Sequence, residues 1–306
     1  MDDSTSPRVT TQPRTTPWID AAVRAGGGIV VEPADATAVV WTRADDPSGL
    51  ATFLADRPDI DWVQLPWAGI EPYLPVIDRV RTWSCAKGVY SDPVAEHALA
   101  LVLAGFRQVH RFARETTWTG PSGRNLFGAK VTILGGGGIA EVLIRLLGPF
   151  GCDVTVVRRT PKAMEGVSRV LGTDALHDAL AGADVLVLAL PLIDGTRRLI
   201  SAEELALLAP GAWVVNVARG EHIGTDALTA ALESGHLGGA GLDVTDPEPL
   251  PDDHPLWHLP GVIITPHTGN TPAMAVPLLS ARITDNVRRY GTGEPLVGLV
   301  DPDLGY

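Results

Sequence analysis

Cysteine and long apolar runs are both scarce in this sequence. No stretch of eighteen apolar residues occurs, and the polar N-terminus MDDSTSPRVTTQPRTTPW has no apolar core of a signal peptide, so we expect neither a membrane span nor a secretory leader. The two cysteines, Cys85 and Cys152, lack C-x-x-C spacing and lie among apolar residues. They fit small core residues in a reducing compartment, which indicates a cytoplasmic protein without disulfides, and no metal site is expected.

Basic residues are too few for some classes of partner. The 306-residue chain carries 24 Lys and Arg against 36 Asp and Glu, a formal net charge of −12, and it has no basic cluster. A nucleic acid or an anionic membrane surface is therefore not expected as its partner. Apolar residues make up 45% of the chain, so at this length two domains with separate cores are possible.

The first ninety residues predict a small α/β unit, because short apolar stretches alternate there with helical or loop segments. The strand candidates are residues 27–32, 37–42, 61–66 and 81–86. The next segment, VAEHALALVLAGFRQVHRFARE (94–115), has apolar residues at helical spacing from Val94 to Val109. This spacing predicts one long helix that could serve as a hinge between domains, and His97 and His110 on it are interpreted as structural.

From residue 130 onward the pattern changes to a regular alternation of strands and helices. The predicted strands, nearly all apolar as in a sheet covered on both faces, are residues 131–134, 153–158, 184–190, 212–218, 240–244 and 262–266. Ser201 and Glu204 form a capping-box pattern, and a helix that begins at Thr225 should end at Gly235. The alternation predicts a doubly wound parallel sheet.

Four consecutive glycines, Gly135 to Gly138, separate a predicted strand from a predicted helix in VTILGGGGIAEVL. Gly135 would make the tight turn and Gly137 would let backbone N–H groups approach a pyrophosphate, with Ala140 at the third position of G-x-G-x-x-G/A. The helix N-terminus adds partial positive charge. A flexible surface turn is the alternative, but the strand–turn–helix context favours a dinucleotide site. Its residues would be Gly135, Gly137, Gly138 and Ile139.

The end of the following strand indicates which dinucleotide is bound. An NAD site carries Asp or Glu about 20 residues after the glycines, to accept from the ribose 2′-OH. Here that position is occupied by Arg158, Arg159 and Thr160. A guanidinium binds a 2′-phosphate through two hydrogen bonds, whereas a carboxylate would repel it. We therefore expect NADP(H), with NAD(H) possible; two surface arginines at a strand end are the alternative interpretation.

Three later segments each end a strand of the same predicted sheet. Arg219 lies in NVARG after one strand, and His267 lies in TPHTGN after the last. Between them, LDVTDPEP places Asp243 at a strand end and Glu248 five residues later. Ligands of open α/β sheets bind outside the carboxyl ends of the strands, so these side chains should face the nucleotide. Singly, each could be a loop residue or an ion-pair partner; the ordered set favours catalysis.

In these motifs the sequence resembles the D-isomer-specific 2-hydroxyacid dehydrogenase family, over the stretch from about Trp62 to His267. The shared segments, in the family's order, are LPWAG (65–69), VAEHALAL (94–101), LPLIDGT (190–196), NVARG, LDVTDPEP and TPH. The resemblance implies a Rossmann nucleotide domain with a smaller, flavodoxin-like substrate domain. We expect the first at residues 100–273 and the second at 1–99 plus 274–306.

The resemblance also implies roles for the residues of the site. Arg219 would bind the substrate carboxylate in bidentate fashion and polarise the keto oxygen. His267, oriented by Glu248, would donate a proton to that oxygen as hydride arrives from the nicotinamide. The other implied contacts are Asp243, Pro191, Thr196 and Ala218 to the cofactor, and the backbone of Trp67, Ala68 and Gly69 to the substrate carboxylate.

The sequence thus predicts an NADPH-dependent reductase of a small 2-keto acid, such as glyoxylate or hydroxypyruvate, that yields a D-2-hydroxy acid; the substrate and a homodimer rest on the resemblance alone. An NAD-dependent D-2-hydroxyacid or phosphoglycerate dehydrogenase is one alternative. A non-catalytic, nucleotide-sensing binding protein is another, although pure binding needs no proton donor such as His267. Two departures from the family pattern bear on specificity: Arg158 replaces the usual Asp, and Thr-Gly-Asn follows His267.

Overall fold

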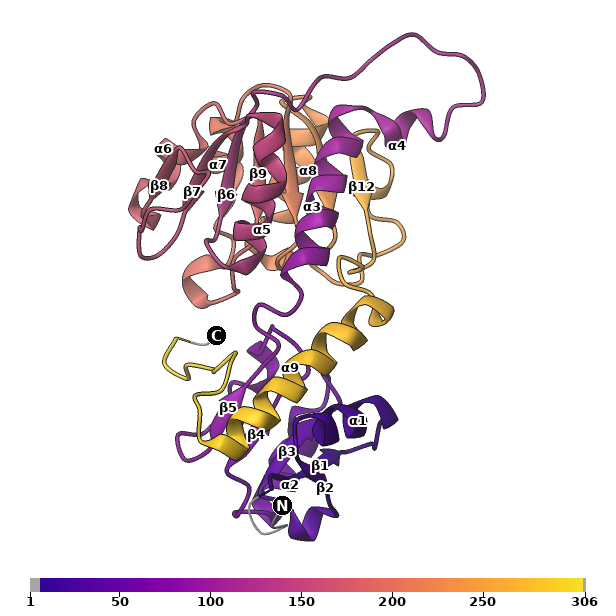
Figure 1. The fold of residues 1–306 in the computed structure, drawn as a ribbon. Coiled ribbons are helices and arrows are strands. Elements are labelled where there is room, and N and C mark those ends of the chain that lie inside the picture. Colours follow the sequence, from indigo (N-terminus) through magenta and orange to yellow (C-terminus); the bar gives the residue numbers. More distant parts are fainter. Residues whose placement is uncertain (1–5, 305–306) are drawn as a thin grey trace. The chain divides into compact units, whose positions relative to one another are not determined.

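The computed structural model describes residues 6–304, which form two compact units (Figure 1). One unit comprises the chain up to Tyr90 together with the segment from Thr271 onward, and the other comprises Ser91–Asn270. The predicted boundary between residues 99 and 100 falls inside a helix, whereas this division lies at the start of that helix. Each unit has its own all-parallel sheet. The predicted α/β fold class with two separate sheets is therefore confirmed.

The first unit contains a five-stranded sheet in the order β2-β1-β3-β4-β5, which is the flavodoxin-like order. Its strands are β1 (Arg8–Gln12), β2 (Ile29–Val30), β3 (Ala38–Trp41), β4 (Trp62–Gln64) and β5 (Thr82–Ser84). Four of the five lie within predicted stretches. Strand β1 was not predicted, because its short sequence RVTTQ is mostly polar although three of its residues are buried.

Helices of the first unit come from both ends of the chain. They are α1 (Pro17–Ala25), α2 (Pro47–Asp56) and α9 (Pro272–Thr292), with short 3₁₀ turns η1 (Pro33–Asp35) and η2 (Glu71–Tyr73). Thr284 on α9 donates a hydrogen bond to the carbonyl of Ala22 on α1 (3.1 Å), and Ile283 and Val287 are buried. Helix α9 therefore brings the chain back to the first unit. No helix within residues 6–304 is long and apolar enough to cross a membrane.

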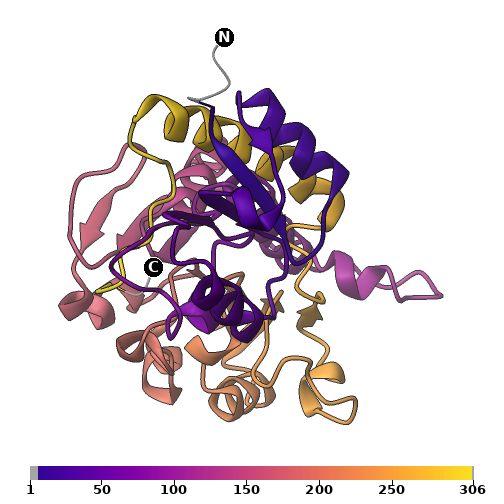
Figure 2. The ribbon, with the colours of Figure 1, turned by 90° about the horizontal axis from the view of Figure 1, so that it is seen from below.

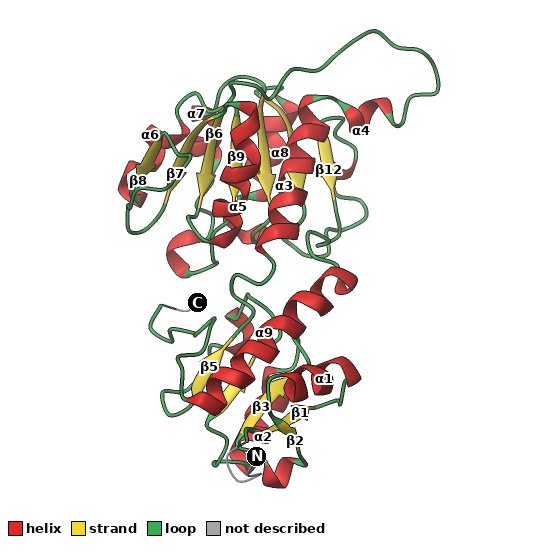
Figure 3. Ribbon diagram, viewed as in Figure 1, coloured by secondary structure: helices red, strands yellow, loops and turns green. Residues whose placement is uncertain are grey.

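The second unit is a seven-stranded parallel sheet in the order β12-β11-β10-β9-β6-β7-β8 (Figure 3). Its strands are β6 (Lys130–Leu134), β7 (Asp153–Val157), β8 (Arg169–Leu171), β9 (Val185–Leu188), β10 (Ala212–Asn216), β11 (Leu237–Leu242) and β12 (Val262–Ile264). The predicted doubly wound sheet is confirmed. Only the short edge strand β8 was not predicted. The strand order reverses between β6 and β9, which marks the switch point where ligands bind in such sheets.

Helices cover both faces of this sheet (Figure 1). On one face lie α3 (Ser91–Phe106) and α5 (Gly138–Leu147), and on the other α6 (Leu176–Leu180), α7 (Ala202–Leu207) and α8 (Thr225–Glu233). The 3₁₀ turns are η3 (Gly148–Phe150), η4 (Thr173–Ala175), η5 (Asp194–Thr196), η6 (Gly220–His222) and η7 (Pro255–Trp257). Two buried apolar clusters match the two faces. The predicted capping box at Ser201 is present.

The prediction of a single helix over residues 94–115 is wrong. The chain forms α3 and then a separate short helix, α4 (Val109–Phe112). Gln108 between them has φ 54°, in the left-handed region, and this ends the regular helix. The apolar spacing continues across the break, so the periodicity could not reveal it. After α4 the chain extends away from the rest of the unit and returns to β6, and Trp118 in this segment is fully exposed (Figures 1 and 2).

Candidate active site

The glycine turn joins β6 to α5 at the switch point of the sheet. Gly135 has φ 106°, and a Cβ there would collide with the carbonyl oxygen of Ala189 just after β9, so only glycine fits. Gly137 caps the helix, and a Cβ there would meet no heavy atom within 4 Å. Gly138 is the first helical residue, and the next residue, Ile139, packs against the core. An open glycine turn at a helix N-terminus fits the pyrophosphate of a dinucleotide.

Arg158 lies beside the same turn. It follows β7, its backbone N–H donates to Leu171 (3.0 Å), and a Cβ added to Gly136 would come within 2.9 Å of the Arg158 Cδ atom and 3.0 Å of its Nε. Arg159 and Thr160 follow it and are exposed. The structure therefore places a guanidinium next to the open glycine turn, as binding of a 2′-phosphate requires.

A turn after β9 carries the predicted cofactor contacts Pro191 and Thr196. The Thr196 hydroxyl accepts from the backbone N–H of Ile193 and lies 2.9 Å from the carbonyl oxygen of Pro191, so it closes the turn. The turn is also held by His222, whose Nδ1 lies 2.9 Å from the Thr196 carbonyl oxygen and whose Nε2 lies 3.2 Å from that of Leu190. His222 was not predicted, because its partners are backbone atoms 26 to 32 residues away and no sequence pattern signals them.

Arg219 follows β10 in a turn built by its neighbours. Asn216 is buried; its Nδ2 donates to the Arg219 carbonyl (2.8 Å) and its Oδ1 accepts from the Ala218 N–H (3.0 Å). The guanidinium of Arg219 donates to the Ala218 carbonyl (2.7 Å). A Cβ on Gly220 would collide with the backbone of Thr245, so the Arg219 turn lies directly against the segment after β11.

His267 and Glu248, two residues of the predicted catalytic set, form a hydrogen-bonded side-chain pair. His267 Nδ1 lies 2.7 Å from Glu248 Oε1, although the two residues are 19 positions apart. Their side chains are 54% and 43% exposed, so both can meet a ligand. Because the carboxylate engages Nδ1, the Nε2 atom is the ring nitrogen available for proton exchange. The backbone of His267 is left-handed, with φ 49°.

Asp243 is buried and binds the loop that carries His267. Its carboxylate accepts from the Thr265 hydroxyl (2.6 Å) and from the backbone N–H groups of Thr268 (2.8 Å) and Gly269 (2.9 Å). Burial raises the pKa of Asp243, but the hydrogen bonds from His97, Thr265 and the two backbone groups outweigh it and bring the pKa to about 2. Both carboxylate oxygens are thus engaged inside the protein, and contact with a nicotinamide stays a prediction.

The predicted substrate loop belongs to the first unit, after β4. The Trp67 ring is 5.9 Å from that of Tyr90, and the Tyr90 hydroxyl donates to the Pro66 carbonyl (2.9 Å). The Trp67 carbonyl accepts from the N–H of Ala86 (3.0 Å). Trp67 and Ala68 are exposed on this braced loop, with Gly69 half-buried.

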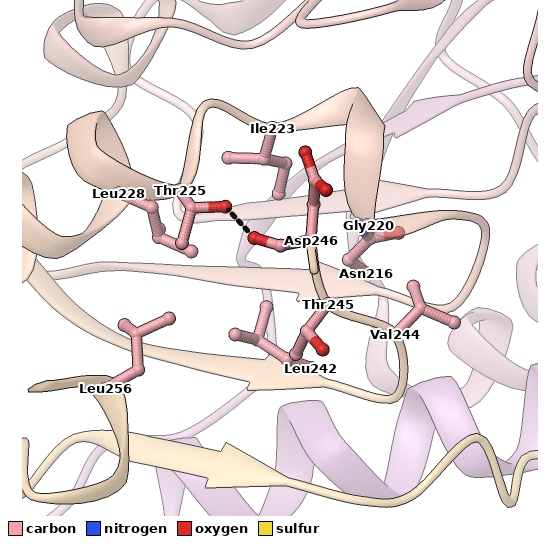
Figure 4. A pocket seen from close by; sticks show the side chains of 10 residues that line it. All are labelled: Asn216, Gly220, Ile223, Thr225, Leu228, Leu242, Val244, Thr245, Asp246 and Leu256. Atoms are coloured by element: carbon pink, nitrogen blue, oxygen red, sulfur yellow. Dashed lines mark hydrogen bonds between the residues drawn. The ribbon is translucent and has the colours of Figure 1, made fainter. Parts of the chain in front are cut away.

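A small pocket lies beside the Arg219 turn (Figure 4). Its lining residues are Asn216, Gly220, Ile223, Thr225, Leu228, Leu242, Val244, Thr245, Asp246 and Leu256. Across it, the Thr225 hydroxyl donates to the Asp246 carbonyl (2.7 Å). None of the predicted catalytic side chains lines this pocket, so we assign it no ligand.

Comparison with known proteins shows which family the sequence matches. Residues 97–269 match the family model described as "D-isomer specific 2-hydroxyacid dehydrogenase, NAD binding domain". A glyoxylate/hydroxypyruvate reductase A of Serratia proteamaculans (strain 568) is 34% identical over 220 residues, which cover 71% of this chain and 69% of the relative.

Two solved structures are similar over almost the whole chain. A D-isomer specific 2-hydroxyacid dehydrogenase from Xanthobacter autotrophicus Py2, in complex with NADPH and MES, has a TM-score of 0.85 and 31% identity, covering 98% of this chain and 100% of its own. An NADPH-dependent glyoxylate/hydroxypyruvate reductase from Sinorhizobium meliloti, in complex with NADP and sulfate, has a TM-score of 0.81 and 26% identity, with the same coverage.

Proposed function

The chain belongs to the D-isomer specific 2-hydroxyacid dehydrogenase family, and from this premise we propose that it is an NADPH-dependent reductase of small 2-keto acids. Family membership makes it an NAD(P)-dependent oxidoreductase. The finer proposal is that it forms a D-2-hydroxy acid, with glyoxylate and hydroxypyruvate as the first substrates to test. The names of the Serratia and Sinorhizobium relatives support that choice.

The cofactor part of the proposal rests on the glycine turn and Arg158. Gly135, Gly137 and Gly138 with the N-terminus of α5 would hold the pyrophosphate, and Arg158 would hold the 2′-phosphate. The open space above Gly137 and the closeness of Arg158 to Gly136 both fit such a ligand. When bound, NADPH supplies the hydride. The similar structures from Xanthobacter and Sinorhizobium, in complex with NADPH and NADP, support this preference.

The single observation that carries the catalytic part is the 2.7 Å contact between His267 and Glu248. The carboxylate engages Nδ1 and fixes the ring orientation, which leaves His267 Nε2 as the atom that donates the proton. In reduction, this proton goes to the keto oxygen of the substrate, while Arg219 binds the substrate carboxylate through two hydrogen bonds. The exposed ring then regains a proton from water. A protein that only senses nucleotides needs no such pair.

The proposal is tested by steady-state kinetics on a panel of 2-keto acids, including glyoxylate, hydroxypyruvate and pyruvate, with NADPH and with NADH. We expect turnover of small 2-keto acids with NADPH and a D-configured product from hydroxypyruvate, identified by chiral chromatography. Absence of turnover with every keto acid and both cofactors contradicts the enzyme proposal, and equal rates with both cofactors contradict the cofactor preference alone. We also propose a homodimer, from the family resemblance, which light scattering tests directly.

A further inference from the structure

His97 on α3 reaches the carboxyl ends of two neighbouring strands. Its Nε2 lies 2.9 Å from the Thr265 hydroxyl and 3.3 Å from Asp243 Oδ1, and its side chain is 20% exposed. The partners are 168 and 146 positions away in the chain, which is why the sequence alone indicated only a structural histidine. The contact links α3 to the strand ends that precede His267.

The directions of these hydrogen bonds follow from the number of protons available. The Asp243 carboxylate only accepts, so the Thr265 hydroxyl, 2.6 Å away, donates its single proton to it. The same hydroxyl can then only accept from His97. His97 Nε2 must therefore carry a hydrogen, and it is shared between Thr265 and Asp243.

The group that His97 supports is the catalytic loop itself. The backbone N–H of His267 donates to the Asp243 carbonyl (2.9 Å), and the next two N–H groups donate to the Asp243 carboxylate. A Cβ on Gly269 would lie 3.0 Å from Asp243 Oδ2 and 3.6 Å from His97 Cδ2, so the loop is packed tightly against both. His267 has a left-handed backbone, which is unfavourable for a non-glycine residue and persists only where the surroundings enforce it.

We propose that His97 is a positioning residue for the proton donor: through Thr265 and Asp243 it fixes the loop that presents His267 to the substrate. The inference rests on the proposed role of His267. Loss of the support should slow the chemical step more than it weakens cofactor binding, because misplacement of a catalytic group by about 1 Å can cost on the order of 10²-fold in rate.

A purely structural role for His97 would act through the packing of α3, and the chain offers a control for that. Helix α3 already buries Ala98, Leu101 and Val102 against the sheet. Strand β12 lies at the edge of the sheet, between Pro260 and Thr265. His110, on α4, makes a comparable contact before the start of this strand, where its Nε2 lies 3.0 Å from the Pro260 carbonyl oxygen. It ties the helical region to β12 without touching the His267 loop.

The test uses the full chain with four substitutions. His97→Leu removes the N–H donor, His97→Gln retains one at a similar reach, Thr265→Val removes the hydroxyl, and His110→Leu is the control. Kinetics give kcat and KM for the best keto acid, fluorescence titration gives the Kd for NADPH, and thermal unfolding gives Tm. We expect His97→Leu and Thr265→Val to lower kcat by about 10- to 100-fold with the Kd for NADPH nearly unchanged. His97→Gln should restore most of kcat, and His110→Leu should keep it.

The double variant His97→Leu/Thr265→Val sharpens the test, because residues in one hydrogen-bond network do not act additively. The kcat of the double variant should be no lower than the kcat of the slower of the two single variants. Additive losses, a wild-type kcat in His97→Leu, or an equal loss in His110→Leu each overturn the positioning role. If His97→Leu does not fold, the Thr265→Val and His97→Gln results decide in the same way. Failure of the proposed role of His267 is seen separately, as near-native kcat in His267→Ala, and failure of the proposed function is seen as absence of turnover in the wild type.

Discussion

His267 is the residue on which the proposed chemistry depends most directly. Its replacement by alanine removes the proton donor and should lower kcat for keto-acid reduction by on the order of 10²–10⁴-fold. NADPH should still bind, since the glycine turn and Arg158 are untouched, and fluorescence titration measures this. The exposed His258→Ala is the matched control and should keep wild-type kcat. A near-native kcat in His267→Ala would show that another group donates the proton.

Arg158 sets the expected preference between the two cofactors. One charge-assisted hydrogen bond contributes about 1.5–3 kcal/mol, which is about tenfold or more in affinity. The wild type should therefore favour NADPH over NADH by at least about tenfold in kcat/KM. Arg158→Asp should weaken NADPH strongly, through lost attraction and new repulsion, and should help NADH modestly.

Arg145→Asp is the control for this cofactor switch, because it changes the net charge equally but lies in the last turn of α5. It should leave the ratio of kcat/KM values near that of the wild type. In the wild type, the ratio of kcat/KM for NADPH to kcat/KM for NADH should decrease at high salt, because salt screens an exposed arginine–phosphate contact. Equal use of NADPH and NADH by the wild type at low salt would contradict the role of Arg158.

The sequence revealed those residues whose chemistry is tied to a strand end. Arg219, Glu248 and His267 follow predicted strands, and parallel strands bring their carboxyl ends to one edge of the sheet. The contacts of His97 and His222 could not be predicted, because they depend on distant side chains or on backbone carbonyl groups. The family resemblance already implied that Glu248 orients His267, whereas the hydrogen bonds by which Asp243 holds the His267 loop became clear only from the structure.

Among the structural elements, the turn between β6 and α5 contains two glycines with different roles. Gly135 is required by the fold, and Gly137 leaves open space for a ligand. Gly135→Ala should destabilise the protein, because φ is positive there and the Cβ collides with Ala189. Gly137→Ala has open space for its Cβ, so Tm without cofactor should stay near that of the wild type while the Kd for NADPH rises. Thermal unfolding with and without NADPH measures both. A loss of stability in Gly137→Ala equal to that in Gly135→Ala would contradict an open cradle.

Strands with continuous apolar sequences were predictable, and elements defined by tertiary contacts were not. The nearly all-apolar strands β7 and β10 lie within their predicted stretches, and β6 begins one residue before its predicted stretch. Strand β1 buries Thr10 and Thr11, whose hydroxyl groups made the segment look exposed; the Thr11 hydroxyl donates to Asp20 (3.0 Å). The break after α3 depends on the conformation of a single residue, and helical spacing is insensitive to it.

For the whole molecule, two buried titratable groups predict a pH-dependent free energy of unfolding. Hydrogen bonds hold the pKa of Asp243 at about 2, below its ordinary value of about 3.8. Its stabilisation is therefore complete above about pH 4 and is lost as the pH falls toward 2. This window lies well below neutrality, so it is separate from any change that a histidine produces.

His222 should make the free energy of unfolding depend on pH near neutrality. Burial lowers its pKa below the ordinary 6.5 and outweighs the two carbonyl oxygens, which favour the proton; Arg219 lowers it further and Glu221 raises it. As the pH falls through about 6.5, the unfolded chain therefore takes up a proton before the folded one does. The free energy of unfolding should then decrease with falling pH and level off below the folded-state pKa.

The measurement is thermal unfolding from pH 8 to pH 5 of the wild type, His222→Gln and His258→Gln. Glutamine does not titrate, so His222→Gln should lose part of the decline in Tm below pH 6.5, even if its Tm at pH 8 is lower through the changed contacts with Leu190 and Thr196. His258 is exposed and not buried like His222, so His258→Gln should follow the wild-type curve. If His222→Gln and the wild type decline in parallel over this range, the buried imidazole of His222 is not what couples unfolding to protons there.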